Sequence, residues 1–306
     1  MCAKTQVTVQ KVHTYTGHKD AIYTLEPGEK ENIFYSAGGD GHVIEWDLNN
    51  FESGRLIAKI PTSVYGLHFL AERGILIIGQ NYEGIHLINV ADLSIVGSLK
   101  LTKNAIFDIK VFENLIIVAA GNGELFVVDL DTLQIVKKSS IAEKNLRTIF
   151  ITEKKKCLIG TSEGKIIQID LGTLKIEKEI LGHDNSVFSL ASSSNEPLMV
   201  SGSRDAKLKF WDIETLSITE SINAHMYAIN DIKFHKSGLH FATASMDKTI
   251  KIWDYKKKKL IKVIDKARHQ GHLTSVNKLV WSSHNDYLIS CSDDRSIGVW
   301  SIDIGK

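Results

Sequence analysis

The sequence predicts an all-β fold in which one unit of about 42 residues occurs seven times. Four ungapped segments share the same residues at the same spacing, and three weaker copies fill the interval between the first and second of them. Turns rich in Gly, Asp, Asn and Ser divide every copy into short β-prone runs. A fixed period of roughly 20 to 50 residues is typical of repeat architectures. We therefore expect residues 1–306 to form a single domain of seven units.

The four strong copies carry a histidine, a hydroxyl residue 18 positions later, an aspartate 22 positions later and a tryptophan 28 positions later. Chance does not produce the same three spacings four times. These copies are predicted to be the first, fifth, sixth and seventh units. The four sets, which we call the quartets, are His18/Ser36/Asp40/Trp46, His183/Ser201/Asp205/Trp211, His225/Thr243/Asp247/Trp253 and His272/Ser290/Asp294/Trp300.

Three weaker copies occupy the interval between the first two quartets. An apolar pair three residues apart, such as Ile22/Leu25 or Ile106/Ile109, recurs in all seven units. The weaker copies lack the quartet, so we expect apolar packing to replace the polar network over about 60–171. Aliphatic residues stand near the three tryptophan positions, namely Ile88, Val128 and Ile169.

The Gly-His to Trp-Asp frame of these units, with four short β runs in each, resembles the WD-repeat family. The resemblance covers essentially the whole chain. It implies a seven-bladed β-propeller made of four-stranded antiparallel blades around a central channel. It also implies that each quartet is a structural hydrogen-bonded chain from Trp to Ser or Thr to His to Asp, with the aspartate fixing a turn between two strands.

The two ends of the chain indicate how such a ring would close. A β-prone stretch, Thr5–Thr16, precedes the first unit and has no unit of its own. Only six residues follow Trp300, which is too few for the fourth strand that every other unit can accommodate. The resemblance implies that the N-terminal strand pairs into the last blade and leaves no open sheet edge.

Sets of Ser, His and Asp have a second interpretation, because nucleophilic hydrolysis needs a hydroxyl, a base and an orienting acid within bonding distance. Four copies in register argue against it, since an active site is one constellation at one exposed place. The stretch Gly160–Gly164 matches G-x-S-x-G, but it lies between two predicted strands and not at the strand-to-helix turn that this motif requires. We predict no catalytic residues; an enzyme or small-molecule binder using the central channel is the alternative.

Composition and charge narrow the class of partner. The 37 basic and 36 acidic side chains leave a formal net charge of +1, so attraction of the whole molecule to nucleic acid or to an anionic membrane is weak. The densest basic stretch, Lys256–Lys259, is predicted to be a solvated edge strand and loop rather than a nucleic-acid surface. No metal, phosphate or cofactor motif occurs, so neither a metal nor a cofactor is predicted.

The cysteines Cys2, Cys157 and Cys291 are too scattered for a disulfide framework and are interpreted as free thiols in a reducing compartment. The N-terminal residues lack an apolar stretch of signal-peptide length, and no window has the roughly 18 consecutive apolar residues of a spanning helix. We expect a cytoplasmic protein without membrane contact. A closed ring needs no second copy to protect its edges, so a monomer is expected.

In the WD-repeat family, the face around the central channel commonly binds proteins or peptides. The resemblance implies that positions one, three and five after the histidine, and the residue before the turn aspartate, point to this face. The predicted partner-binding residues are Lys19, Tyr23, Tyr65, Phe107, Arg147, Asp184, Phe188, Arg204, Met226, Asn230, Met246, Asn277 and Asp293. Binding hot spots favour aromatic residues and arginine; the alternative is that these aromatics only pack the channel wall. The sequence thus predicts a non-enzymatic scaffold for a protein or peptide partner.

Overall fold

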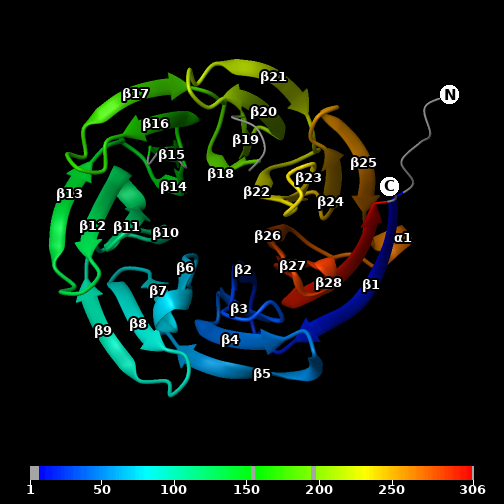
Figure 1. The fold of residues 1–306 in the computed structure, drawn as a ribbon, viewed down its shortest axis with the longest axis horizontal. Coiled ribbons are helices and arrows are strands. Elements are labelled where there is room, and N and C mark those ends of the chain that lie inside the picture. Colours follow the sequence, from blue (N-terminus) through cyan, green and yellow to red (C-terminus); the bar gives the residue numbers. More distant parts are fainter. Residues whose placement is uncertain (1–6, 153–155, 194–197, 305–306) are drawn as a thin grey trace.

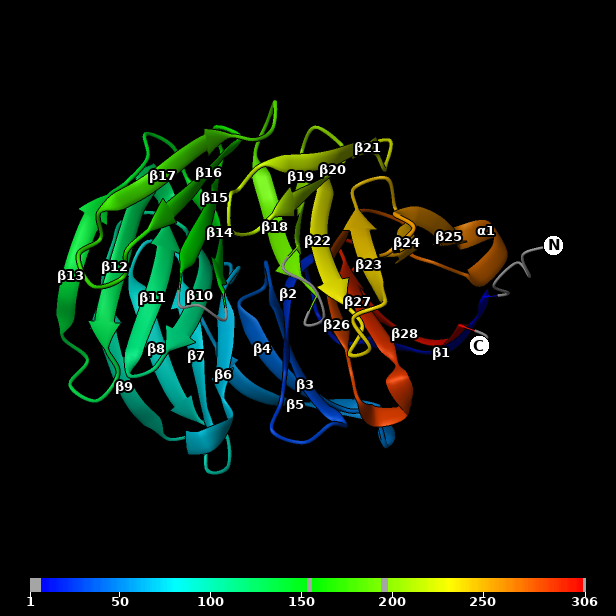
Figure 2. The ribbon, with the colours of Figure 1, turned by 45° about the horizontal axis from the view of Figure 1, so that its top comes forward.

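The computed structural model describes residues 7–152, 156–193 and 198–304, and these form seven four-stranded antiparallel sheets. The sheets stand as blades around a central axis, with the first strand of each blade innermost (Figure 1). Figure 2 shows the inner strands of neighbouring blades side by side around the same axis. The predicted all-β seven-bladed propeller is confirmed.

The first four blades follow one another along the chain. Blade one comprises β2 (Ile22–Pro27), β3 (Ile33–Gly38), β4 (His42–Asp47) and β5 (Asn50–Lys59). Blade two comprises β6 (Leu67–Leu70), β7 (Ile75–Gln80), β8 (Gly84–Asn89) and β9 (Ile95–Lys100). Blade three comprises β10 (Ile106–Phe112), β11 (Leu115–Ala120), β12 (Glu124–Asp129) and β13 (Ile135–Ser140). Blade four comprises β14 (Leu146–Ile151), β15 (Cys157–Thr161), β16 (Lys165–Ile169) and β17 (Ile176–Leu181).

The last three blades complete the ring. Blade five comprises β18 (Val187–Ser192), β19 (Leu198–Ser203), β20 (Lys207–Asp212) and β21 (Ile218–Asn223). Blade six comprises β22 (Ile229–Phe234), β23 (His240–Ser245), β24 (Ile250–Asp254) and β25 (Lys259–Ile264). Blade seven comprises β26 (Val276–Trp281), β27 (Leu288–Ser292), β28 (Ser296–Ile304) and β1 (Val7–Thr16). Three short 3-10 turns are η1 (Ala71–Arg73), η2 (Gly121–Gly123) and η3 (His284–Asp286).

The ring closes through β1, as predicted. This strand runs antiparallel to β28, from Val7 opposite Ile304 to Thr16 opposite Ser296. Tyr15 of β1 is buried, and its hydroxyl donates a hydrogen bond to the carbonyl of Asp47 in blade one at 2.6 Å. The strand therefore completes blade seven and also contacts the first blade. Thr5 and Gln6 of the predicted strand lie outside the described residues.

The hydrophobic core lies between neighbouring blades. Ile106 and Ile109, the apolar pair of β10, are fully buried in a cluster that also contains Ile75 and Ile77 of blade two. A single sheet cannot bury both of its faces alone, so stacking against the next blade is what stabilises each unit. The thiols of Cys157 and Cys291 are free and buried in this core, whereas Cys2 lies outside the described residues.

One helix departs from the all-strand prediction. The α-helix α1 (Lys266–His269) lies between β25 and β26 and accounts for the long spacing of 47 residues in the last unit. The side chain of Asp265 caps it by accepting the backbone N–H of Arg268 at 2.8 Å. Four residues are too few to show a helical period in a sequence, so a pattern search has no signal for this helix.

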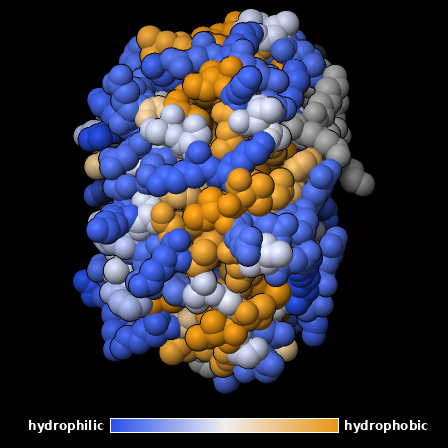
Figure 3. Space-filling view, turned by 90° about the vertical axis from the view of Figure 1, so that its left-hand side faces the viewer, coloured by the Kyte–Doolittle hydropathy of each residue, from blue (hydrophilic) through white to orange (hydrophobic). Residues whose placement is uncertain are grey.

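The outer strands of blades two to four expose apolar side chains on the rim. Figure 3 looks onto these blades and shows apolar bands between polar ones. The rim is thus a second apolar surface, separate from the channel face. Its most exposed members are Ile95 and Val96 of β9, Val136 of β13 and Leu181 of β17.

Candidate functional site

The residues at position five after the histidine sit on a β-bulge at the mouth of the channel. In six inner strands, the pairing with the next strand skips one residue, as between Ile106 and Asp108. A bulge turns a side chain out of the regular alternation of the sheet, so the backbone itself presents these residues. In blade two, Tyr65 precedes β6 and is placed by the loop instead. The skipped residues are Tyr23, Phe107, Arg147, Phe188, Asn230 and Asn277.

Five of these side chains touch in sequence, and we call Tyr23, Tyr65, Phe107, Arg147 and Phe188 the aromatic arc. The ring centroids of Tyr23 and Tyr65 are 4.9 Å apart, and those of Tyr65 and Phe107 are 5.7 Å apart. The guanidinium carbon of Arg147 lies over the Phe107 ring at 4.2 Å and over the Phe188 ring at 5.5 Å. All five are partly exposed, so the arc is a continuous surface across blades one to five.

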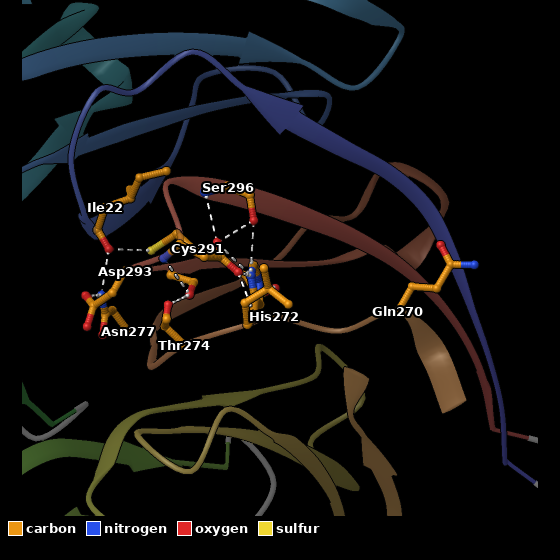
Figure 4. A network of polar contacts seen from close by, with 12 residues as sticks. Ile22, Gln270, His272, Thr274, Asn277, Cys291, Asp293 and Ser296 are labelled. Carbon is orange, nitrogen blue, oxygen red and sulfur yellow. Dashed lines mark hydrogen bonds and ion pairs between the residues drawn. The ribbon is translucent and has the colours of Figure 1, made fainter. Parts of the chain in front are cut away.

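The two other bulge residues, Asn230 and Asn277, are polar and hydrogen-bonded. The amide of Asn230 donates to the carbonyl of Val276 at 2.8 Å and to the hydroxyl of Ser275 at 2.9 Å. The amide of Asn277 donates to the carbonyl of Ile22 and to the carboxylate of Asp293, as Figure 4 shows. These amides therefore hold blades six, seven and one together at the same level as the arc.

The remaining predicted face residues lie outside this ring. Lys19, Asp184 and Arg204 are exposed, and Asp184 forms an ion pair with Lys207 at 2.8 Å. Met226 and Met246 are 81% and 56% exposed.

One exposed apolar residue was missing from the prediction, namely Tyr227, which directly follows Met226. Leu273 is exposed too, and it stands at position one after the last quartet histidine, which the family rule assigns to this face. The signal that could have identified Tyr227 is an apolar residue in a loop next to a quartet histidine.

Each quartet forms one hydrogen-bonded chain. In blade five, Trp211 Nε1 donates to Ser201 Oγ at 2.8 Å, and Ser201 Oγ lies 2.6 Å from His183 Nε2. His183 Nδ1 lies 2.8 Å from the Asp205 carboxylate. A carboxylate can only accept, so Nδ1 carries the proton and the hydroxyl donates to Nε2.

The same chain is present in the three other quartets. The bonds from indole to hydroxyl run from Trp46 to Ser36 at 2.7 Å, from Trp253 to Thr243 at 3.0 Å and from Trp300 to Ser290 at 2.8 Å. The hydroxyls lie 2.7 to 2.8 Å from their histidines, namely Ser36 from His18, Thr243 from His225 and Ser290 from His272. The histidines in turn contact their aspartates, which are Asp40, Asp247 and Asp294.

The quartets differ from the channel face in that most of their side chains are buried. The hydroxyl residues have no exposed surface at all, and they are Ser36, Ser201, Thr243 and Ser290. The tryptophans are at most 3% exposed, and they are Trp46, Trp211, Trp253 and Trp300. The histidines are buried too, and only the aspartates are partly exposed. A hydroxyl without exposed surface cannot attack a substrate, so the quartets act inside the blades and not as hydrolytic sites.

The aspartate of each quartet also fixes the loop above it. Asp205 accepts the backbone N–H groups of Asp184 and Lys207. Burial alone would raise the pKa of Asp205, but these bonds and the one from His183 outweigh it and lower the pKa to about 2. Burial likewise lowers the pKa of His18 and His225 more than their aspartates raise it. In the quartets of blades one and six, a neutral histidine is thus bonded to a charged aspartate.

Blades two to four carry aliphatic residues in the places of the quartet. The carbonyls of Gly41 and Gly123 accept the backbone N–H groups of Ile60 and Ile141, as Gly164 does for His183. In blades two and four, the residues at the histidine, hydroxyl and tryptophan places share one core cluster. The two clearest sets are Ile60/Ile78/Ile88 and Ile141/Ile159/Ile169.

Charged residues of the inner strands form ion pairs next to the bulge positions, and the prediction contained none of them. Asp108 pairs with Lys110 at 3.1 Å, and Asp231 pairs with Lys278 at 3.4 Å. Asp108 also accepts the backbone N–H of Ile149 in the next blade at 2.7 Å. A repeated I-x-D-I-K pattern, at 106–110 and 229–233, is the sequence signal that could have revealed them. Because these carboxylates are already paired, they serve to connect neighbouring blades.

Within the described ranges, no helix is long and apolar enough to cross a membrane. The same residues contain no group of three His, Cys, Asp or Glu side chains placed to hold a metal ion.

Comparison with known proteins agrees with the geometry. The family model described as nucleolar protein 10-like, N-terminal domain, matches residues 131–306, and the model described as WD domain, G-beta repeat, matches residues 9–47. The crystal structure of the WD40 beta propeller domain of Doa1 superposes with a TM-score of 0.85 at 17% identity, covering 97% of each chain.

Two curated relatives are much longer proteins, and this chain matches only a small part of each. WD repeat-containing protein 3 of Homo sapiens is 26% identical over 99 residues, which are 32% of this chain and 10% of that protein. BEACH domain-containing protein B of Arabidopsis thaliana is 22% identical over 163 residues, which are 51% of this chain and 6% of that protein. The match therefore spans a tenth or less of these relatives.

The closed ring and the four quartets define a propeller of the WD type, a class that typically serves in protein interactions and is usually non-catalytic. The chain belongs to the WD40-repeat β-propeller family, and its residues 131–306 match the nucleolar protein 10-like domain within it.

Proposed function

We propose that this chain is a non-enzymatic scaffold whose channel face binds a protein or peptide partner, with the aromatic arc as the centre of the contact. The observation that carries the proposal is the arc itself, five large side chains in continuous contact and partly exposed. Packing alone would not require the bulges that turn four of the five arc residues out of the regular alternation of the sheet. Aromatic and arginine side chains contribute most to binding because they bury a large area with few rotamers.

The charged residues of the inner strands support a scaffold over an enzyme. Asp108 and Asp231 are each paired with a lysine, and Glu26 lies 3.4 Å from His68. A general acid or base has to be available to a substrate, and here the carboxylates are engaged with neighbouring blades.

Affinity capture from the native lysate tests the proposal. The bait proteins are the wild type, a Tyr23/Tyr65/Phe188 triple alanine variant, and a control that carries Ile95→Ala, Val96→Ala and Val136→Ala on the outer rim. We expect a stoichiometric protein that the arc variant loses and the rim control retains. Mass spectrometry identifies the retained species, and melting temperatures show that both variants are folded.

Two results would contradict the proposal. Retention of the same partner by the folded arc variant would mean that the aromatics pack the channel wall without binding. A wild-type bait that retains a small molecule and no protein would favour the alternative of a channel ligand.

The cellular compartment in which the chain acts is a further part of this proposal. A cytoplasmic location stays a prediction from the sequence, and the match to a domain named nucleolar protein 10-like adds the nucleolus as a second location. Fluorescence microscopy of the tagged full chain distinguishes the two.

A further inference from the structure

Arg147 is the charged member of the aromatic arc, and among the described residues no carboxylate contacts it. A guanidinium has five N–H donors; here Nε donates to the hydroxyl of Ser162 at 2.7 Å, and the two Nη groups have no acceptor in the described protein. Burial lowers the pKa of Arg147, while the nearby Tyr65 raises it and Arg204 lowers it by smaller amounts. The cation is therefore partly desolvated and held by ring contacts and one hydroxyl.

Other arginines of the chain differ from Arg147 in this respect. Arg55 pairs with Glu45 at 2.9 Å, and Arg73 pairs with Asp131 at 2.7 Å, although both arginines lie on the surface. A desolvated cation gains more from an anionic partner than a solvated one does. Arg147 is thus more buried than Arg55 and Arg73, yet no carboxylate of the described residues pairs with it.

The side chains around Arg147 determine which kind of anion fits against its guanidinium. Phe107 and Phe188 flank the guanidinium, so a ligand reaches it along the edge that carries the Nη groups. A planar carboxylate forms two parallel hydrogen bonds with that edge. A phosphate can form the same two bonds, but its second negative charge makes it costlier to remove from water between two rings than a carboxylate.

We propose that Arg147 binds the carboxylate of an aspartate or glutamate side chain in a partner peptide. This inference rests on the proposed function and names the chemistry of the partner. The rings of Tyr65 and Phe107 continue the arc beside Arg147, so the residue next to the acidic one is apolar. Ser162 is a positioning residue, because its hydroxyl fixes Nε and thereby the plane of the guanidinium.

A peptide library tests this inference. The probes are immobilised octapeptides, random except for one central residue that is Glu, Gln, phosphoserine or Lys. The proteins are the full-length wild type, Arg147→Gln, Arg147→Lys, Ser162→Ala and Lys144→Gln. Lys144 is exposed in the loop before β14, so its variant removes one positive charge from the same blade and is the matched control.

We expect the wild type to bind Glu peptides about tenfold better than Gln peptides, which corresponds to about 1.4 kcal/mol. Arg147→Gln should lose this preference. Arg147→Lys should lose most of it because a lysine lacks the planar fork, and Ser162→Ala should lose part of it. Lys144→Gln should keep the wild-type preference. Melting temperatures show which variants are folded, and Ser162→Ala provides the mildest change.

Other outcomes overturn the inference in distinguishable ways. A stronger preference for phosphoserine than for Glu would replace the carboxylate by a phosphate. A Glu preference that Arg147→Gln retains would place the anion elsewhere. Peptides bound without any acidic preference would reject the inference and leave the proposed function standing, whereas no bound peptide at all would count against both.

Discussion

Blades one, five, six and seven differ from blades two, three and four in how they connect their strands. The first group uses a polar chain, in which Asp205 holds His183 and the backbone of the loop. The second group uses aliphatic contacts, in which Ile141 and Ile159 belong to a buried cluster. Both groups have the same four-stranded antiparallel pairing.

The comparison teaches that the quartet is not what sets the geometry of a blade. The features common to all seven blades are the buried apolar pair of the inner strand and the turns between strands. The quartet adds a bond from the turn to the loop above it, because its aspartate accepts a backbone N–H from the residue after the histidine. Buried polar groups of this kind stabilise a fold only when each is satisfied.

Blade seven gives the strongest test, since it has a complete quartet but receives its fourth strand from β1. Deleting residues 1–15 leaves β28 as an open edge and removes the buried Tyr15. We expect an insoluble protein or a loss of unfolding free energy larger than the roughly 3 kcal/mol of a single quartet variant. Thermal melting measures it, with deletion of residues 1–6 as the control. An unchanged melting temperature would show that the quartet alone maintains the blade.

A pair of single substitutions compares the two kinds of blade directly. Asp205→Ala leaves the N–H of His183 and two backbone N–H groups unpaired, and we expect a cost of about 3 kcal/mol. Ile159→Ala in blade four opens a cavity in the core, with an expected cost of about 3 kcal/mol as well. Urea unfolding at pH 7 measures both. A cost below about 1 kcal/mol for Asp205→Ala would mean that water replaces its partners.

The smallest effect expected is a dependence of stability on pH to which the quartet histidine His225 contributes. The folded-state pKa of His225 is below its ordinary value of about 6.5, so the unfolded chain binds more protons below that pH. Stability is therefore complete above about pH 6.5 and falls as the pH is lowered. We expect His225→Leu to have a shallower slope between pH 7.5 and 5.5, and Ile141→Ala to keep the wild-type slope. Equal slopes in all three proteins would contradict a neutral quartet histidine.

Much of the architecture could be predicted because it repeats. The fixed distances from His18 to Trp46 and their copies located the blades, and the six residues after Trp300 indicated that the N-terminal strand closes the ring. The helix α1 could not be predicted, because one turn shows no period. That residues 1–306 form a single domain stays a prediction.

The candidate site was predictable only in part. Counting five residues from His18 and His183 identified Tyr23 and Phe188. The other three residues of the arc were identified because each follows the first member of its unit's apolar pair, and equivalent positions in a ring face the same way. Their contact depends on the bulges and on how neighbouring blades approach each other, which no spacing along the chain encodes. The pair Asp108 and Lys110 was missed because the charges stand within an apolar strand pattern. The role of the face residues in binding remains a prediction.

The pairing of β1 with β28 has a consequence for synthesis. The partner of Val7 is Ile304, so β1 emerges from the ribosome almost 300 residues before the strand that it pairs with. At about 5 to 20 residues per second, this interval is roughly 15 to 60 seconds. During that time β1 is an unpaired strand, and six blades can form while the ring stays open. Emergence of β28 is then the event that locks the propeller, and any delay in it extends the period in which a nascent chain can pair with a neighbour instead.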